Sequence, residues 1–168
     1  CGCRTYFPYH DQVLFSKTLS LQKCKEIRDL LRKTNVEGVL EGKDGVYFDN
    51  SIRHPFLQNI KENYQAVPTF KVSTFDDENL SFDKFAIWFD QNSDIETFKK
   101  EISEEFQYIT RDHDFGEIVP KGCSKATGIE FLLDYFNLEL EDAYVFGDSF
   151  NDLAMLEYVK YAIVMGNG

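Results

Sequence analysis

The segment Ala143-Tyr-Val-Phe-Gly-Asp-Ser-Phe-Asn-Asp-Leu-Ala-Met-Leu156 says more about the fold than any other part of the chain. An apolar run ends at Gly147, and an apolar helical pattern begins a few residues later. Between them stand the polar residues Asp148, Asn151 and Asp152. Open α/β sheets bind ligands just outside the carboxyl ends of their strands, so we expect Asp148 to lie at a ligand site. A carboxylate beside a helix start suits magnesium together with a phosphate group.

The same residues have a plainer interpretation. Asp and Ser satisfy unpaired backbone amides at the start of a helix and are common in turns. Short motifs also match by chance. Taken alone, this segment therefore leaves a phosphate site and an ordinary helix cap as open alternatives.

A second segment, Glu117-Ile-Val-Pro-Lys-Gly-Cys-Ser-Lys-Ala-Thr-Gly-Ile129, favours the phosphate site. It predicts a short strand at 118–119, a turn, and a helix capped by Ser124 or a neighbour. Lys125 then lies in the first turn of that helix, where the helix dipole disfavours a cation unless an anion is near. The alternative is a solvated lysine, which is the usual state of this residue.

In this order the two segments resemble the carboxy-terminal half of a haloacid dehalogenase (HAD) superfamily phosphatase, and more narrowly its Cof-type hydrolases. Lys125 matches the third motif of that family. Asp148, Asn151 and Asp152 match the fourth. The resemblance is close over residues 113–168 and looser elsewhere. It implies an α/β fold: part of a HAD-like Rossmannoid core with an inserted α+β cap domain of the C2 type.

The family's first motif, Asp-x-Asp-Gly-Thr, does not occur in this sequence. The nearest acidic clusters are Phe75-Asp-Asp-Glu and Asp112-His-Asp, and neither follows an apolar strand. The second motif, a Ser or Thr on a core strand, is not identifiable either. The sequence opens at Cys1 without a methionine and stops at Gly168 in what should be a loop. We therefore expect an internal piece of a longer protein, with the nucleophile and the acid upstream.

The resemblance and the pattern of elements divide the chain into a core segment over 1–15, an α+β cap over 16–112 and a second core segment over 113–168. Helices alternate with antiparallel hairpins in the middle part, which favours an open-faced α+β layer. A polar stretch over 110–116 suits a hinge between cap and core. The expected elements are a helix from Leu21, a hairpin across Gly42–Gly45, a helix over 51–64, a strand over 82–89, a helix capped by Asp94 with Phe106 in register, and strands over 108–110 and 115–119.

Composition indicates a cytoplasmic domain that binds neither nucleic acid nor membrane. The net charge of −11 argues against a nucleic-acid partner, which usually needs a basic face. No apolar run approaches the roughly 20 residues that span a bilayer, and no signal peptide opens the sequence. The four cysteines are scattered and fit no zinc spacing, so free thiols are expected, including those of Cys1 and Cys3.

The resemblance implies Mg²⁺-dependent hydrolysis of phosphate monoesters of small metabolites through an aspartyl-phosphate. Asp148 is the expected metal ligand, and Asp152 is expected to act through water or by orienting the direct ligands. Lys125 would hold the phosphate oxygens, and Asn151 would donate an amide hydrogen bond to them. Two alternatives stay open: a non-catalytic binding module with the same fold, and a phosphotransferase or mutase of the superfamily. The chain alone, without the nucleophile, is expected to be inactive; the substrate and the oligomeric state are not indicated.

Overall fold

A computed structural model describes residues 4–7, 12–43 and 45–166. The chain divides into two compact units. Thr18–Lys121 form one, here called the sheet unit. Cys1–Lys17 together with Gly122–Gly168 form the other, called the motif unit because it contains Lys125, Asp148, Asn151 and Asp152, the residues that match the family motifs. Each unit is described by itself.

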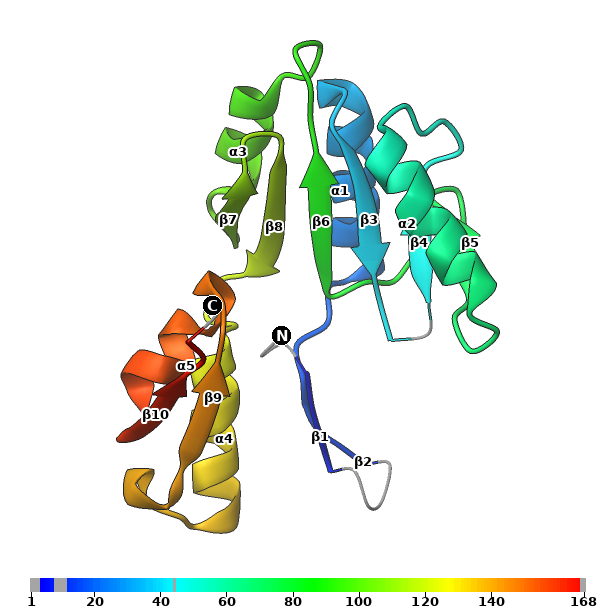
Figure 1. The fold of residues 1–168 in the computed structure, drawn as a ribbon. Coiled ribbons are helices and arrows are strands. Elements are labelled where there is room, and N and C mark those ends of the chain that lie inside the picture. The colour runs from blue at the N-terminus through cyan, green and yellow to red at the C-terminus, as the bar shows by residue number, and fades with distance from the viewer. Residues whose placement is uncertain (1–3, 8–11, 44, 167–168) are drawn as a thin grey trace. The chain divides into compact units, whose positions relative to one another are not determined.

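The sheet unit is built on a six-stranded sheet with the strand order β5-β4-β3-β6-β8-β7 (Figure 1). Neighbouring strands are antiparallel except for β4 and β5, which are parallel. The hairpin expected around Gly42–Gly45 is confirmed, because β3 and β4 pair across it. The strands are β3 (Glu37–Glu41), β4 (Val46–Phe48), β5 (Val72–Thr74), β6 (Lys84–Trp88), β7 (Phe106–Asp112) and β8 (Phe115–Pro120).

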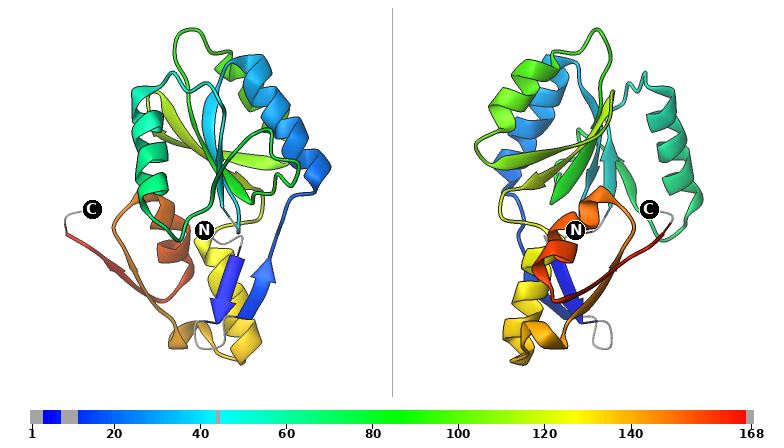
Figure 2. Two further views of the ribbon diagram at one scale, coloured as in Figure 1. Left: turned by 90° about the vertical axis from the view of Figure 1, so that its right-hand side faces the viewer. Right: turned by 60° about the vertical axis from the view of Figure 1, so that its left-hand side comes forward.

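Three helices cover this sheet, and they do not all lie on one face (Figure 2). Helices α1 (Leu21–Thr34) and α3 (Ile95–Ile102) pack on one face and share an apolar core with it. Helix α2 (Pro55–Ala66) packs over a second core on the opposite face. The expectation of an open-faced layer is therefore wrong over this part of the sheet. Helix α2 covers the second face, where its Leu57 is buried among apolar residues of β3 and β4.

Phenylalanine dominates the first of these cores. The ring of Phe85 lies 5.7 Å from that of Phe82, 6.4 Å from Phe98 and 5.8 Å from Phe106. The spacing of Phe106 predicts that it continues the preceding helix. This prediction is wrong, because Phe106 is the first residue of β7. A residue four positions beyond the end of α3 thus reaches the same core from a strand.

The polar stretch over 110–116 is a hairpin and not a hinge. Thr110 still belongs to β7, the turn lies at His113 and Asp114, and β8 follows at once. Because β8 pairs with both β6 and β7, it is an inner strand of the sheet. The division between the units accordingly falls after Lys121, and not at the expected residue 112.

The motif unit contains two separate pairs of strands. β1 (Arg4–Phe7) pairs antiparallel with β2 (Gln12–Ser16), and β9 (Tyr144–Gly147) pairs parallel with β10 (Tyr161–Val164). Helix α4 (Lys125–Phe136) precedes β9, and helix α5 (Leu153–Tyr158) joins β9 to β10. Short 3-10 turns lie at Leu140–Asp142 and Phe150–Asp152.

Two findings bear on the remaining compositional expectations. Cys24 and Cys123 are buried free thiols, as predicted, whereas Cys1 and Cys3 lie outside the described residues. Burial raises the pKa of the Cys24 thiol. Among the described helices, none combines the length and the apolar character needed to cross a bilayer.

Candidate functional site

The candidate site is built where β9 ends. Val145 and Gly147 are buried, and the strand continues directly into the exposed Asp148. The parallel pairing with β10 extends past this point, since the amide of Met165 donates to the carbonyl of Gly147 at 3.0 Å. The predicted strand before Asp148 is therefore confirmed, with Asp148 at the carboxyl end of a parallel strand. The strand is only half buried, however, because Tyr144 and Phe146 are exposed.

Gly147 allows the next turn to fold closely against the strand. A Cβ atom at this position would lie 2.7 Å from Cβ of Asp152 and 3.0 Å from Cδ1 of Leu156. Such contacts are too short for any larger residue without a shift of the neighbouring side chains. The absence of a side chain at Gly147 thus leaves room for the side chain of Asp152 to pack against the end of β9.

Asp152 is the organising residue of this loop. Its side chain is buried, and its Oδ2 atom accepts the backbone N–H groups of Asp148 at 3.1 Å and of Ser149 at 3.3 Å. Its Oδ1 atom accepts a hydrogen bond from the ammonium group of Lys125. The bond from Lys125, followed by those from the two amides, holds the pKa of this carboxyl below its usual range against the opposing effect of burial.

Lys125 reaches Asp152 from the first turn of α4. The helix begins there because Ser124 caps it: the Ser124 hydroxyl accepts the N–H of Thr127 at 3.1 Å, and the Thr127 hydroxyl accepts the N–H of Ser124 at 2.9 Å. Gly122 makes the preceding turn with a φ of 76°, a left-handed conformation that side chains disfavour. The anion expected near Lys125 is thus present within the chain itself. The Lys125 side chain remains 36% exposed, so its ammonium can still meet a ligand.

Asn151 is oriented by its neighbour. The hydroxyl of Ser149 donates to Oδ1 of Asn151 at 2.5 Å. This bond uses the carbonyl oxygen of the side chain, so the NH₂ group of Asn151 is the part that can donate to a phosphate oxygen.

Asp148 contrasts with Asp152. It is exposed, and within the described ranges its carboxylate receives no hydrogen bond and forms no ion pair. Carboxylate oxygens are the ligands that Mg²⁺ takes from proteins. An accessible carboxylate at the end of a parallel strand therefore fits a magnesium ligand in donor type and in position.

The structure places all four residues that the sequence singled out in the motif unit, and hydrogen bonds connect three of them. Lys125 joins Asp152 directly, and Asp152 fixes the backbone that carries Asp148. Sequence reasoning missed Ser149. The pattern Ser149-x-x-Asp152 carries the signal of a capping box, which predicts that Asp152 turns back onto the amide of Ser149.

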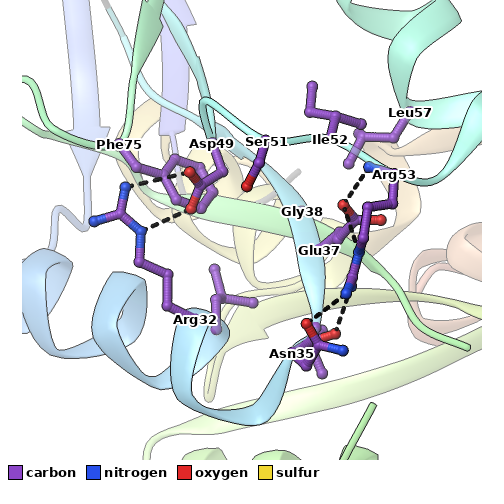
Figure 3. Close-up of a pocket in the computed structure, with 12 residues that line it drawn as sticks. Arg32, Asn35, Glu37, Gly38, Asp49, Ser51, Ile52, Arg53, Leu57 and Phe75 are labelled. Atoms are coloured by element: carbon purple, nitrogen blue, oxygen red, sulfur yellow. Dashed lines mark hydrogen bonds and ion pairs between the residues drawn. The ribbon is translucent and has the colours of Figure 1, made fainter. Parts of the chain in front are cut away.

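The sheet unit contains a polar cavity of about 150 Å³ beside Glu37 and Asp49 (Figure 3). Arg32 donates to Asp49 at 2.7 Å and to Asp76 at 2.9 Å, and these bonds raise the pKa of its guanidinium. The Nε atom of Arg53 lies 3.5 Å from Oε1 of Glu37. Each guanidinium is thus paired with carboxylates, and none of Lys125, Asp148, Asn151 and Asp152 lines this cavity.

Comparison with known proteins identifies relatives of this chain. The haloacid dehalogenase-like hydrolase family matches residues 2–168. The chain is 28% identical over 162 residues to the 5-amino-6-(5-phospho-D-ribitylamino)uracil phosphatase YitU of Bacillus subtilis, covering 92% of this chain and 58% of that protein. It is 36% identical over 69 residues to an HMP-PP phosphatase of Yersinia pseudotuberculosis, covering 41% of this chain and 25% of that protein.

Solved structures show the same fold. A haloacid dehalogenase-like hydrolase from Bacteroides thetaiotaomicron superposes on 99% of this chain and 64% of its own with a TM-score of 0.78, at 18% sequence identity. The chain belongs to the haloacid dehalogenase-like hydrolase family. It spans 58% of the length of the Bacillus relative.

Proposed function

We propose that this chain is part of a Mg²⁺-dependent phosphatase that hydrolyses phosphate monoesters of small metabolites. The observation that supports this most is the hydrogen-bond network that connects Lys125, Asp152 and the backbone of Asp148. This network holds the ammonium group of Lys125 and the unpaired carboxylate of Asp148 near the end of β9. The two phosphatases named above act on small phosphorylated compounds, which favours a substrate of that class. The buried free thiols suit the cytoplasm.

In this proposal Asp148 supplies the metal ligand that comes from this chain. A bound magnesium ion would neutralise charge on the transferred phosphoryl group. Lys125 binds phosphate oxygens and stabilises the charge that they carry in the transition state. Asn151 donates its NH₂ group to the same oxygens, held in that orientation by Ser149.

Asp152 is proposed to position Lys125 and the Asp148 loop. Both of its oxygens are already engaged by protein donors. Its influence on a metal would therefore pass through the Asp148 backbone. This matches the expected indirect role, in which the outer residue orients the direct ligand.

The sheet unit is proposed to be the cap domain of the family. It folds around its own cores and is joined to the motif unit near Lys17 and Lys121. A cap that closes excludes water and completes the site. The nucleophile and the general acid would come from sequence outside these 168 residues.

The test is phosphate release by the complete purified protein from a panel of sugar phosphates, nucleotides and phosphorylated cofactors, with and without Mg²⁺. The Asp148→Asn variant is expected to lose both its activity and its response to magnesium. Asp134→Asn is the matched control, because it makes the same chemical change at an exposed position on α4.

Unchanged magnesium-dependent activity in Asp148→Asn would remove this residue from the metal site. Activity that does not depend on a divalent cation in the unsubstituted protein would overturn the proposed mechanism. The 168-residue chain by itself is expected to release no phosphate, and release by that chain would show that it holds its own nucleophile.

A further inference from the structure

The loop that carries the proposed phosphate-binding groups also carries an unburied phenyl ring. Phe150 lies between Asp148 and Asn151 in the chain and is 85% exposed. This is the highest exposure among the large apolar side chains that the structure describes, and the next two, Phe146 and Val164, are 65% exposed. Single exposed apolar side chains are common on protein surfaces. Phe150 differs from most of them because it belongs to the loop of the candidate site.

The backbone that carries this ring is fixed on both sides. Phe150 is the first residue of a 3-10 turn, in which the N–H of Asp152 donates to the carbonyl of Ser149 at 2.9 Å and the N–H of Leu153 donates to the carbonyl of Phe150. Before the turn, the carboxylate of Asp152 accepts the amides of Asp148 and Ser149. Only the two side-chain torsions of Phe150 remain free, so covering its ring with a ligand costs little conformational entropy.

The fold of the motif unit gains little from this ring. A side chain that is 85% exposed buries almost no apolar surface on folding. In the described part of the motif unit, the contacts between aromatic rings do not include Phe150; they join Phe15, Phe131, Tyr135, Phe136, Tyr144 and Tyr161. Phe150 is therefore free to bind a ligand.

The polar groups of the site serve only one part of a phosphate monoester. Lys125 and Asn151 are proposed to bind the phosphate, and Asp148 to bind the metal. The organic group of the ester then needs a separate contact. Phenylalanine has no polar atom with which to bind the hydroxyl groups of a sugar. The two faces of its ring are apolar, and another flat ring covers such a face well.

A second exposed apolar side chain lies at the same end of the strands. Met165 follows β10, is 48% exposed, and its N–H donates to the carbonyl of Gly147 at 3.0 Å. Its backbone is thus held beside the residue that precedes Asp148. Polar and apolar side chains therefore meet at this edge, which suits a molecule that has both a phosphate and an apolar ring.

We propose that Phe150 stacks on a flat aromatic ring in the organic group of the substrate. The protein would then favour phosphate esters that contain such a ring over simple sugar phosphates. This inference rests on the proposed function and narrows its substrate class. Neighbouring Cα atoms are about 3.8 Å apart, so one small molecule can reach both Asn151 and Phe150.

The test compares two groups of substrates with the complete protein. Nucleoside monophosphates, flavin mononucleotide and phenyl phosphate contain a flat ring, whereas glycerol phosphate and sugar phosphates do not. Phe150→Ala is expected to lower kcat/KM for the first group about tenfold, through KM, because one stacked ring is lost. It should leave kcat/KM for the second group within about twofold. Phe150→Tyr keeps the ring and should behave as the unsubstituted protein does.

Phe136→Ala is the matched control. It makes the same chemical change in the same unit, at the opposite end of α4 from Lys125, roughly 16 Å away. This variant should not distinguish the two groups of substrates. Equal losses for both groups in Phe150→Ala would show a structural role and overturn the proposal. No loss for the ring-containing group would overturn it as well.

A binding measurement separates this proposal from the proposed phosphatase activity. In the Phe150→Trp variant, flavin mononucleotide or a nucleoside monophosphate is expected to quench the fluorescence that the variant adds to that of Trp88, and glycerol phosphate is not. If the complete protein released no phosphate from any substrate, the proposed function would fail and this measurement would still decide the role of Phe150. Equal quenching by both kinds of compound, or no quenching by either, would overturn the stacking role.

Discussion

Replacing Asp152 by alanine is expected to destabilise the motif unit while leaving the sheet unit unaffected. The substitution removes the acceptor of three donors at once, namely the ammonium of Lys125 and the amides of Asp148 and Ser149. The side chain being removed is buried, with 4% of its surface exposed. The three donors would then lose a charged acceptor.

The size of the effect follows from this geometry. Removing one partner of a fully buried ion pair costs about 3–5 kcal/mol. Because the Lys125 side chain is 36% exposed, water can solvate part of its charge, and we expect a smaller loss of about 2–3 kcal/mol. Asp134→Ala, at an exposed position on α4, should change stability by no more than about 0.5 kcal/mol.

The effect of the charge should depend on pH. Lys125 lowers the pKa of Asp152 in the folded state, so the stabilisation is present above the unfolded-state value of about 3.9. It is lost as the pH falls through the lower folded value. The difference in stability between the unsubstituted protein and Asp152→Asn should therefore be constant from about pH 5 to 8 and should shrink below about pH 4.

Urea unfolding followed by two probes separates the units. Trp88 is the only tryptophan and lies in β6, so its fluorescence reports the sheet unit. Hydrogen exchange of the α4 and β9 amides reports the motif unit. Asp152→Ala should raise exchange in α4 and β9 and leave the Trp88 transition in place. Equal exchange in Asp152→Ala and Asp134→Ala, or an Asp152→Asn difference that persists unchanged to pH 3, would refute the reasoning.

Three further predictions concern packing. Phe85→Ala should lower the free energy of unfolding of the sheet unit, measured by Trp88 fluorescence, by about 3–5 kcal/mol, because Phe85 is only 2% exposed. Phe56→Ala is the control and should change it by no more than about 1 kcal/mol, because Phe56 is 58% exposed. Gly147→Ala should displace the Asp152 side chain and cost about 1–3 kcal/mol in the hydrogen-exchange assay, and unchanged exchange would contradict the close contact. In the 168-residue chain the amides of β9 should exchange faster than those of β6, because a pair of strands is less stable than an inner strand of a six-stranded sheet; equal protection would contradict this.

Features set by neighbouring residues were predictable from the sequence. Ser124 and Asp94 cap α4 and α3 as expected, because a cap needs only a side-chain oxygen and an amide three residues away. The strand before Asp148 was predictable from its apolar run. The face of α1 that carries Cys24 and Ile27 is buried, as its helical spacing indicated.

Features set by pairing between distant residues were not predictable in the same way. Residues 110–116 are polar, which fits a hinge and a hairpin equally well. Only the pairing of β8 with β6 and β7 distinguishes them. The position of α2 on the second face likewise depends on where Leu57 finds a core. The bond between Lys125 and Asp152 joins residues far apart in sequence, and no local spacing indicates it.

The sequence around Gly147 and Asp148 left two interpretations open, a phosphate site and an ordinary helix cap. In the structure each interpretation applies to a different aspartate. Asp152 performs the ordinary capping function, since its carboxylate satisfies the amides of Asp148 and Ser149. That arrangement leaves the carboxylate of Asp148 exposed at the end of β9, where a ligand site is expected. A structural role for one residue thus creates the conditions for a functional role in the other. It follows that Asp148→Asn should alter magnesium dependence without altering stability, whereas Asp152→Asn should alter stability and, through Lys125, activity as well.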